Sequence, residues 1–243
     1  MREGTDDAAG QLEAKPGRRP VRNEASGSLT TSWHGVALQL LPQRALYVPD
    51  ECALLVADLH LGKPGAFRLF GSPVPEEVTD VDLQRLSYAI SLTNARRLIV
   101  LGDLFHSRHG RGALTPVLET WRGAHPELEV TLVRGNHDRS AGDPPASLGL
   151  EVVDGPAALG PFDLVHEPPV VAPTRPTIGA HVHPAVSLRS PIGRMRSTCF
   201  WLARDLCVLP AFGTFTGTRI VKPARDDRVF VVGDSVVVAA GPE

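Results

Sequence analysis

Short apolar runs that each lead into polar residues dominate the first half of the chain. Three of these runs have the length and aliphatic composition of buried β-strands, namely residues 53–57, 98–101 and 130–133. Two earlier runs, residues 36–41 and 44–48, predict a β-hairpin joined across Pro42 and Gln43. We therefore expect the fold to begin with an antiparallel pair and to continue into buried strands.

Two amphipathic helices are predicted between these strands. Residues 76–94 place their inward-facing side chains at helical spacing, at Thr79, Leu83, Leu86 and Ile90. Residues 115–125 predict a second helix, with Pro116 in the first turn, where proline is tolerated. Strand and helix thus alternate to about residue 135, which predicts βαβ units with right-handed crossovers.

The second half of the chain changes to short strands separated by turn signals. The predicted strands are residues 151–153, 163–165, 177–179, 199–202, 206–209, 229–232 and 236–238. The last two flank Gly233 and Asp234, which is a hairpin signal. The two halves together predict an α/β fold in which two mixed β-sheets form a sandwich flanked by helices.

Composition divides the chain into a tail and one folded domain. Residues 1–32 combine Gly, Ala, Ser, Pro and both signs of charge with almost no large apolar side chain. Such a segment cannot bury enough surface to offset its ordering entropy, so we expect a disordered tail and a single domain over residues 33–243. The cysteines, Cys52, Cys199 and Cys207, lack CxxC spacing and are expected to be buried, reduced thiols.

Charge and hydropathy narrow the possible environments and partners. The formal net charge of −2 gives no global basic field, so a polyanionic partner would have to be attracted by a local patch or by bound metal ions. No apolar run approaches the roughly 20 residues that cross a bilayer. The N-terminus lacks the apolar core of a secretory signal. We therefore expect the protein in the cytoplasm.

Polar residues that suit divalent cations follow the predicted strands. In open α/β sheets ligands bind at the carboxyl ends of the strands, and seven side chains follow such ends or lie in later loops: Asp58, His60, Asp103, Asn136, His166, His181 and His183. Carboxylate and amide oxygens combined with imidazoles suit Mn²⁺, Fe²⁺ or Zn²⁺, whereas an all-oxygen set would favour Mg²⁺ or Ca²⁺. The absence of nearby thiolates argues against a structural zinc site.

Two neighbouring ions can be assembled from this set. Asp103 follows a small residue at the end of a central strand and is the candidate bridge between them. One ion would be completed by Asp58, His60 and His183, and the other by Asn136, His166 and His181. Two such metal ions would provide the attacking hydroxide and neutralise the charge on the phosphoryl oxygens during phosphodiester hydrolysis.

Further polar residues near the predicted ligands are candidates for catalysis and substrate binding. His137 is predicted to donate a proton to the leaving oxygen or to hold the phosphate, supported by Asp138. Four residues beside the ligand-bearing loops are candidate substrate contacts: Lys63, Arg68, Arg134 and His106. For the three cations among them, surface salt bridges are the alternative. For His106 the alternatives are a role in supporting the metal ligands and a place on the surface without a function.

The candidate ligands fall in five motifs, at residues 58–60, 102–103, 135–138, 166 and 181–183. These motifs in this order resemble the calcineurin-like metallophosphoesterase superfamily. The chain is most similar to the bacterial ligase-associated DNA damage response endonucleases, at residues 58–63, 66–68, 74–75, 102–107, 135–138, 166–168, 181–184, 199–202, 209–213 and 215–217. One departure is Ala180, where the superfamily usually has Gly before the His181 position.

The resemblance implies a fold, an activity and a set of partners. The fold would be a four-layer αββα sandwich, and the activity that of a manganese-preferring phosphodiesterase and DNA endonuclease. Members of this family are encoded beside an ATP-dependent DNA ligase, a large helicase and a metallo-β-lactamase-type exonuclease, which suggests DNA as substrate and a role in DNA repair.

Three other functions remain open from the sequence. A protein phosphatase of the superfamily would typically carry Asp-Arg-Gly after the Gly-Asp motif, where Leu104-Phe105-His106 follows here. A nucleotide-sugar lipid pyrophosphatase would normally have an apolar helical insertion between Asn136 and His166, and the sequence predicts none. A metal-free scaffold would not need the complete set of ligands.

Overall fold

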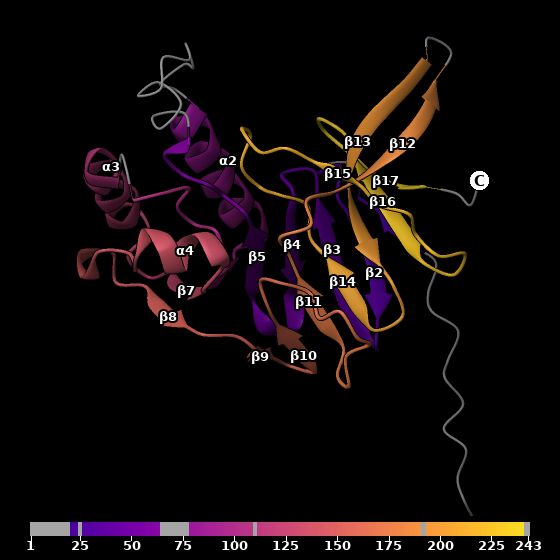
Figure 1. Cartoon of the computed structure of the whole chain (residues 1–243), viewed down its shortest axis with the longest axis horizontal. Coiled ribbons are helices and arrows are strands. Elements are labelled where there is room, and N and C mark those ends of the chain that lie inside the picture. The colour runs from indigo at the N-terminus through magenta and orange to yellow at the C-terminus, as the bar shows by residue number, and fades with distance from the viewer. Residues whose placement is uncertain (1–19, 24–25, 64–77, 109–110, 191–192, 241–243) are drawn as a thin grey trace, which may run out of the picture.

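The computed structural model describes residues 20–23, 26–63, 78–108, 111–190 and 193–240. Two β-sheets lie face to face, with the helices gathered at the first sheet (Figure 1). The predicted pair of mixed sheets is confirmed. The described residues contain no helix that is both long and apolar enough to cross a membrane.

The first sheet follows chain order from β1 to β8. Its strands are β1 (Val21–Arg22), β2 (Leu29–Trp33), β3 (Val36–Leu41), β4 (Ala45–Val48), β5 (Ala53–Ala57), β6 (Arg97–Leu101), β7 (Glu129–Val133) and β8 (Glu151–Val153). Strands β1 to β5 pair antiparallel, and β5 to β8 pair parallel. The predicted hairpin of β3 and β4 and the predicted parallel strands are therefore confirmed.

The second sheet is built from the second half of the chain. It contains β9 (Ala157–Leu159), β10 (Phe162–Leu164), β11 (Thr177–Gly179), β12 (Pro184–Ser190), β13 (Gly193–Leu202), β14 (Leu206–Val208), β15 (Arg219–Ile220), β16 (Arg228–Val232) and β17 (Val237–Ala240). Strands β10, β11 and β14 pair parallel, whereas β12, β13, β16 and β17 pair antiparallel along the chain. The predicted C-terminal hairpin is confirmed as β16 and β17.

Two apolar cores hold the layers together. Between the sheets, leucines of β3 to β5 pack with the aromatic side chains of the second sheet, including Phe162, Phe200 and Phe230. On the other face of the first sheet, α2 (Val78–Thr93) and α3 (Arg111–Gly123) bury Leu83, Leu86 and Leu118. Burial of each large aliphatic side chain contributes about 1.5–3 kcal/mol, so the sheets form a rigid base for the loops at their ends.

The helices are distributed unevenly. Besides α2 and α3, the structure has α4 (Asn136–Ala141) and the 3-10 turns η1 (Pro49–Glu51) and η2 (Ala146–Leu148). No helix occurs after residue 148 in the described ranges, so the outer helical layer predicted over the second sheet is not seen there. The antiparallel connections of this sheet need only turns, and its parallel strands β10, β11 and β14 are joined through loops and the β12–β13 hairpin in place of helices.

Two sequence boundaries differ from the prediction. Strand β2 pairs with β3, and two side chains are buried here, those of Ser28, just before the strand, and Trp33, at its end. Ordered structure therefore begins before residue 33. Trp33 also stacks on Phe162 with ring centroids 5.2 Å apart, and this contact with the second sheet could not be read from local composition. The remainder of the predicted tail, residues 1–19, lies outside the described residues.

Helix α3 begins at Arg111, four residues before the predicted start, so Pro116 lies inside the helix and not in its first turn. Thr115 and Thr120 donate side-chain hydrogen bonds to carbonyls one turn earlier, those of Arg111 and Pro116. The burial of Leu118 against the sheet outweighs the backbone bond that Pro116 cannot make.

Candidate metal centre

Parallel strands of the first sheet deliver half of the candidate site to one edge. Asp58 follows β5 and Asp103 follows β6, while β7 leads through Gly135 into Asn136, the first residue of α4. Backbone hydrogen bonds join the first two loops, because His60 N donates to Asp103 O over 2.8 Å and Asp58 N donates to Gly102 O over 3.2 Å. The ends of adjacent strands are therefore fixed to each other.

The second sheet supplies the remaining histidines. His166 lies beyond β10, and His181 and His183 occupy the connection from β11 to β12. The His181 backbone N–H donates to Asp58 Oδ2 over 3.1 Å, which ties this connection to the first sheet. The site is thus formed where the edges of both sheets meet.

The predicted ligands form two adjacent groups. In each, one donor atom per residue lies within 4.8 Å of the others: Asp58, His60 and His183 in the first, and Asp103, His166 and His181 in the second. Asn136 joins the second group, because its Oδ1 lies 3.0 Å from His166 Nε2. All seven residues proposed from the sequence therefore come together.

Asp103 lies between the two groups. Its Oδ2 is 3.6 Å from His60 Nε2, and its Oδ1 is 3.4 Å from His166 Nε2. One carboxylate oxygen thus faces each group, which is the arrangement that a bridging carboxylate requires.

Several donor atoms have lone pairs that face one another. The Nδ1 atoms of His166 and His183 are 2.9 and 3.0 Å from the carbonyls of Leu101 and Gly217, so in the neutral tautomer each ring keeps a lone pair on Nε2. His183 Nε2 then faces Asp58 Oδ1 at 3.3 Å.

Two atoms in this cluster are buried without a hydrogen-bond partner among the described residues, Asp58 Oδ1 and His60 Nδ1. Buried polar atoms are normally paired, and facing acceptors are satisfied by a cation. The donor set therefore fits divalent metal ions.

Burial and neighbouring charges shift the pKa values of three candidate ligands. Burial lowers the pKa of His60 to about 2, and the neighbouring His137 and His183 add to the shift, so this ring is neutral. Burial raises the pKa of Asp103, opposed mainly by His166. For His183, burial lowers the pKa, but the Asp58 carboxylate outweighs it and the net shift is upward. A metal ion at the site would stabilise the ionised form of the Asp58 and Asp103 carboxylates.

The backbone at the candidate ligands is strained. Five of the seven have a positive φ, namely Asp58 (52°), His60 (47°), Asp103 (52°), His181 (62°) and His183 (50°). This left-handed region disfavours residues other than glycine, and such strain concentrates at functional sites. Packing of the two sheets holds these residues in a conformation that aims their side chains inward.

At two positions near the candidate ligands, neighbouring atoms leave room only for glycine. A Cβ on Gly102 would collide with the His166 ring, and the residue also has a φ of 72°. A Cβ on Gly135 would collide with the side chain and backbone nitrogen of Asp103. Close approach of the loops at these two positions is therefore possible only without a side chain.

Asp138 has a different role from the one predicted. Its buried carboxylate accepts the backbone N–H groups of Asp103 (2.7 Å), Leu104 (3.0 Å) and Gly135 (3.0 Å). His137 Nδ1 instead bonds the His106 carbonyl over 2.9 Å. Asp138 therefore fixes the loops that carry the candidate ligands, and the support expected for the His137 ring comes from a backbone carbonyl.

His106 and His137 lie beside the first group of ligands. Their rings stack with centroids 5.4 Å apart, and one donor atom of each lies within 4.8 Å of a His60 nitrogen. Burial lowers the pKa of His106, with Lys63 and His137 adding to the shift. Both histidines can thus reach a molecule bound at this edge of the site.

The predicted phosphate-binding cations have different surroundings. Lys63 lies near His60 and His106, and burial lowers the pKa of its ammonium group. Arg68 lies outside the described residues.

For Arg134 the alternative of surface salt bridges is correct. Its guanidinium pairs with both carboxylate oxygens of Asp143 at 2.8 Å and with Asp154 at 2.9 Å, and these hydrogen bonds raise its pKa. The guanidinium is thus paired with two protein carboxylates in this structure.

Two features near the site were not predicted from the sequence. Arg139 of α4 is exposed and lines a hollow of about 290 Å³ beside His166. Asp82 of α2 is buried and accepts hydrogen bonds from Thr214 N at 3.1 Å and from Arg85 at 2.9 Å. The role of Asp82 could not be predicted from the sequence, because Thr214 lies 132 residues away along the chain.

The loop that Asp82 holds is part of the site. Gly213 N donates to Asp58 O over 3.1 Å, and Gly217 O bonds His183. Residues 213–217 therefore orient one ligand from each sheet.

Comparison with known proteins agrees with this geometry. No protein-family model and no curated protein matches the sequence. Among solved structures, a nuclease MPE of Pseudomonas putida is 40% identical, with a TM-score of 0.76, over 88% of this chain and 100% of that one. The chain belongs to the calcineurin-like metallophosphoesterase superfamily. The phosphoesterase YfcE of E. coli also matches at 16% identity over 79% of this chain and 99% of that one, but its TM-score of 0.41 adds nothing to the assignment.

Family membership makes the protein a metal-dependent phosphoesterase. The metallophosphoesterase fold explains why ligands separated by more than 100 residues meet at one edge, since the first sheet supplies the carboxylates and the second supplies three of the histidines. The paired groups around Asp103 have the donor atoms that divalent ions require.

Proposed function

We propose that this metallophosphoesterase is a DNA endonuclease that uses two divalent ions, preferably Mn²⁺, to hydrolyse phosphodiester bonds. The observation that carries the proposal is the pair of ligand groups on opposite sides of the Asp103 carboxylate. The relative from Pseudomonas putida supports the choice of nucleic acid, because it is described as a nuclease. When bound, two such ions supply a hydroxide near neutral pH and neutralise charge on the phosphoryl group.

The residues of the chain would hold and position the reacting groups. Asp58, His60 and His183 would bind one ion and Asn136, His166 and His181 the other, with Asp103 shared. Asp138 would keep both loops in place through its backbone hydrogen bonds. The site would thus be rigid before substrate arrives, which lowers the reorganisation required during the reaction.

His137 is the candidate proton donor to the leaving oxygen. Its Nδ1 is hydrogen-bonded to the His106 carbonyl, so Nε2 is the nitrogen that can interact with a substrate. A protonated Nε2 would donate to the leaving oxygen, and His106 and Lys63 would contact the phosphate from the same side. Arg68 remains a candidate phosphate contact.

DNA repair in the cytoplasm is the proposed setting. The family resemblance supports cooperation with an ATP-dependent DNA ligase, a large helicase and a metallo-β-lactamase-type exonuclease. The lipid pyrophosphatase alternative is disfavoured, because the only helices between Asn136 and His166, all of them described residues, are α4 and the short turn η2. Neither is long enough to form an apolar cap for acyl chains.

Activity on three substrates would test the proposal. Metal-stripped protein is incubated with bis-p-nitrophenyl phosphate, p-nitrophenyl phosphate and circular single-stranded DNA, with Mn²⁺, Mg²⁺ or Zn²⁺ added back in turn. We expect diester hydrolysis and linearisation of the circle, strongest with Mn²⁺. Hydrolysis of the monoester alone would instead assign a phosphatase, and no turnover with any ion would favour a scaffold.

A further inference from the structure

An arginine-bearing hairpin begins directly at the candidate metal centre. Strand β12 starts at Pro184, immediately after His183, and returns as β13. Figure 1 shows these two strands extending beyond the rest of their sheet. At about 3.3 Å per residue, Arg189 lies roughly 20 Å from His183 along the strand. The hairpin is thus an arm whose base is at the site.

The register of the hairpin places three arginines on one face. Arg189 is directly opposite Arg194, and Ser187 is opposite Arg196. Residues in register across an antiparallel pair have side chains on the same face, and positions 194 and 196 share a face because side chains alternate along a strand. All three guanidinium groups are exposed. The arm therefore presents a row of positive charge to solvent.

Within the described ranges of the chain, no carboxylate neutralises this row. None of the three arginines has a carboxylate partner among the described residues; Arg196 donates only to the Thr218 carbonyl, over 3.3 Å. Residues 184–202 contain no Asp or Glu, although the whole chain has a net charge of −2. Like charges directly opposite each other destabilise a strand pair, so the Arg189–Arg194 pair has a cost that an anionic ligand would remove.

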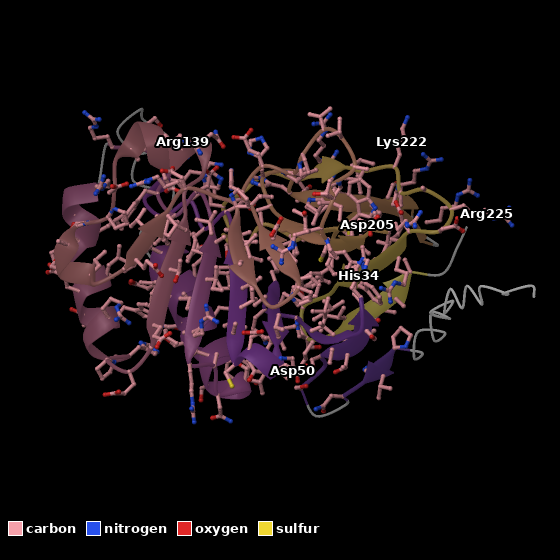
Figure 2. The ribbon with its side chains drawn as sticks, turned by 90° about the horizontal axis from the view of Figure 1, so that it is seen from below. His34, Asp50, Arg139, Asp205, Lys222 and Arg225 are labelled. Carbon is pink, nitrogen blue, oxygen red and sulfur yellow. The ribbon has the colours of Figure 1, made fainter. Side chains whose placement is uncertain are left out.

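Positive charge continues beside the base of the arm. Strand β15 pairs with β12 at Pro184 and Ala185, and the Arg219 N–H donates to the His183 carbonyl over 2.9 Å. Lys222 follows two residues after β15, and in Figure 2 it lies along the same edge of the molecule as Arg139 of α4. Arg219 thus lies next to His183 in this sheet, and Arg139 lines the hollow beside His166.

We infer that the β12–β13 hairpin binds the phosphodiester backbone of the polynucleotide substrate to one side of the bond that is cut. This inference rests on the proposed nuclease function and adds the surface that recognises a long substrate. A distance of about 20 Å corresponds to roughly six phosphates of one strand at 3.4 Å each. A small diester occupies the metal centre without reaching the arm, so the arm distinguishes DNA from small phosphodiesters.

The test removes the charge from the outward face of β13. The double variant Arg194→Gln/Arg196→Gln is compared with Arg175→Gln/Arg204→Gln, which removes the same charge. Arg175 and Arg204 pair with Asp163 and Asp205, and Figure 2 shows Asp205 beside His34, away from the edge that carries Lys222. Circular dichroism and size-exclusion chromatography check the fold and the oligomeric state of each variant.

Binding is measured with the metal-loaded protein and fluorescein-labelled phosphorothioate DNA of ~30 nucleotides, long enough to cover the arm, single-stranded in one series and duplex in another. Loss of two phosphate contacts should weaken binding by about tenfold and reduce the slope of log affinity against log salt by about 1.4 for single strands. Turnover of bis-p-nitrophenyl phosphate should remain as in the wild type, as should all properties of the control variant.

The outcomes separate the arm from the proposed function. Wild-type affinity and salt slope in the β13 variant, or an equal loss in the control variant, would overturn the role of the arm while leaving nuclease activity untouched. New oligomers without a change in DNA affinity would show that the arginines only protect an exposed strand edge. If the wild type binds the DNA through the arm but cuts no polynucleotide, the proposed function fails and the binding surface stands.

Discussion

The carboxylate of Asp138 accepts the backbone N–H of Asp103 over 2.7 Å, although 35 residues separate them in the chain. The same carboxylate accepts N–H groups of Leu104 and Gly135. These hydrogen bonds therefore fix the loop after β6 relative to the start of α4. Asp103, the residue between the two ligand groups, depends for its position on a residue that is not itself a candidate ligand.

Replacement of Asp138 should weaken both stability and activity. Asp138→Ala leaves three buried N–H groups without an acceptor, which should lower the free energy of unfolding by about 2–3 kcal/mol or more. Urea denaturation measures the loss, and Mn²⁺-dependent diester hydrolysis measures the displacement of Asp103. Asp226→Ala removes an exposed carboxylate and should change neither. Unchanged unfolding in the Asp138 variant would contradict the anchoring role.

Loss of the bridging carboxylate should abolish stabilisation by metal. Mn²⁺ at about 100 times its dissociation constant should raise the free energy of unfolding by ~2.7 kcal/mol through mass action, and Asp103→Asn should lose most of this gain. Turnover should fall by about 10²–10³-fold. Thermal unfolding with and without Mn²⁺ provides the measurement. Asp50→Asn, a surface change in η1, serves as the control; an Asp103 variant with the wild-type metal shift would exclude the proposed bridge.

A methyl group at Gly135 should disturb the site. Because the Cβ of Gly135→Ala would collide with the Asp103 side chain and backbone, overpacking should destabilise the protein by about 1–3 kcal/mol and reduce turnover. Gly112→Ala in α3 is the matched control, since its Cβ meets nothing within 4 Å. That control should be neutral or stabilising by at most about 1 kcal/mol. Equal activity in both variants would contradict the close approach.

The contact between Asp82 and the loop at residues 213–217 should control metal affinity. Asp82→Asn weakens the bonds to Thr214, so the Gly217 carbonyl no longer holds His183 in place. Mutation of residues that orient metal ligands typically lowers metal affinity 10–100-fold. We expect the Mn²⁺ dependence of diester hydrolysis to shift to higher concentration, with turnover recovered in excess Mn²⁺. Asp80→Asn, exposed on the same helix, should leave the curve in place.

Lys63 and Arg134 should differ in their effect on DNA cleavage. Lys63→Ala should raise KM for DNA more than it changes turnover of a small diester, because it removes a cation beside His60 and His106. Arg134→Ala should leave both reactions near the wild type, since Asp143 and Asp154 already occupy its guanidinium. Steady-state kinetics on both substrates measure the difference. Equal losses on the two substrates for the Lys63 variant would rule out a positioning role.

Local sequence patterns were sufficient for the elements that depend on burial along one strand or helix. The aliphatic runs of β5, β6 and β7 and the apolar stripe of α2 were predicted nearly to the residue. Their register follows from which side chains must face the core. Helix α3 was the exception, because Pro116 suggested a helix start, whereas the helix begins at Arg111 and Leu114, before the proline, packs against the core.

Contacts between distant segments were beyond local patterns. Ser28 belongs to the tail whose composition suggested disorder, yet it is buried, and Trp33, the first residue of the predicted domain, packs against the second sheet. Arg134 looked like a phosphate contact because it lies next to a ligand-bearing loop, whereas Asp154, 20 residues later, pairs with it. In each case the deciding partner comes from another part of the chain.

The sequence by itself determined the chemistry of the site, because the types of the seven ligand residues and their places after strands restrict which ions and reactions are possible. Only the tertiary structure decided how these residues cooperate. It places one Asp103 oxygen toward each ligand group, assigns Asp138 to the backbone and extends the arginines of β12 and β13 away from His183. The physical reason is that ligand type is a property of single residues, whereas distance and shared contacts depend on how the two sheets pack.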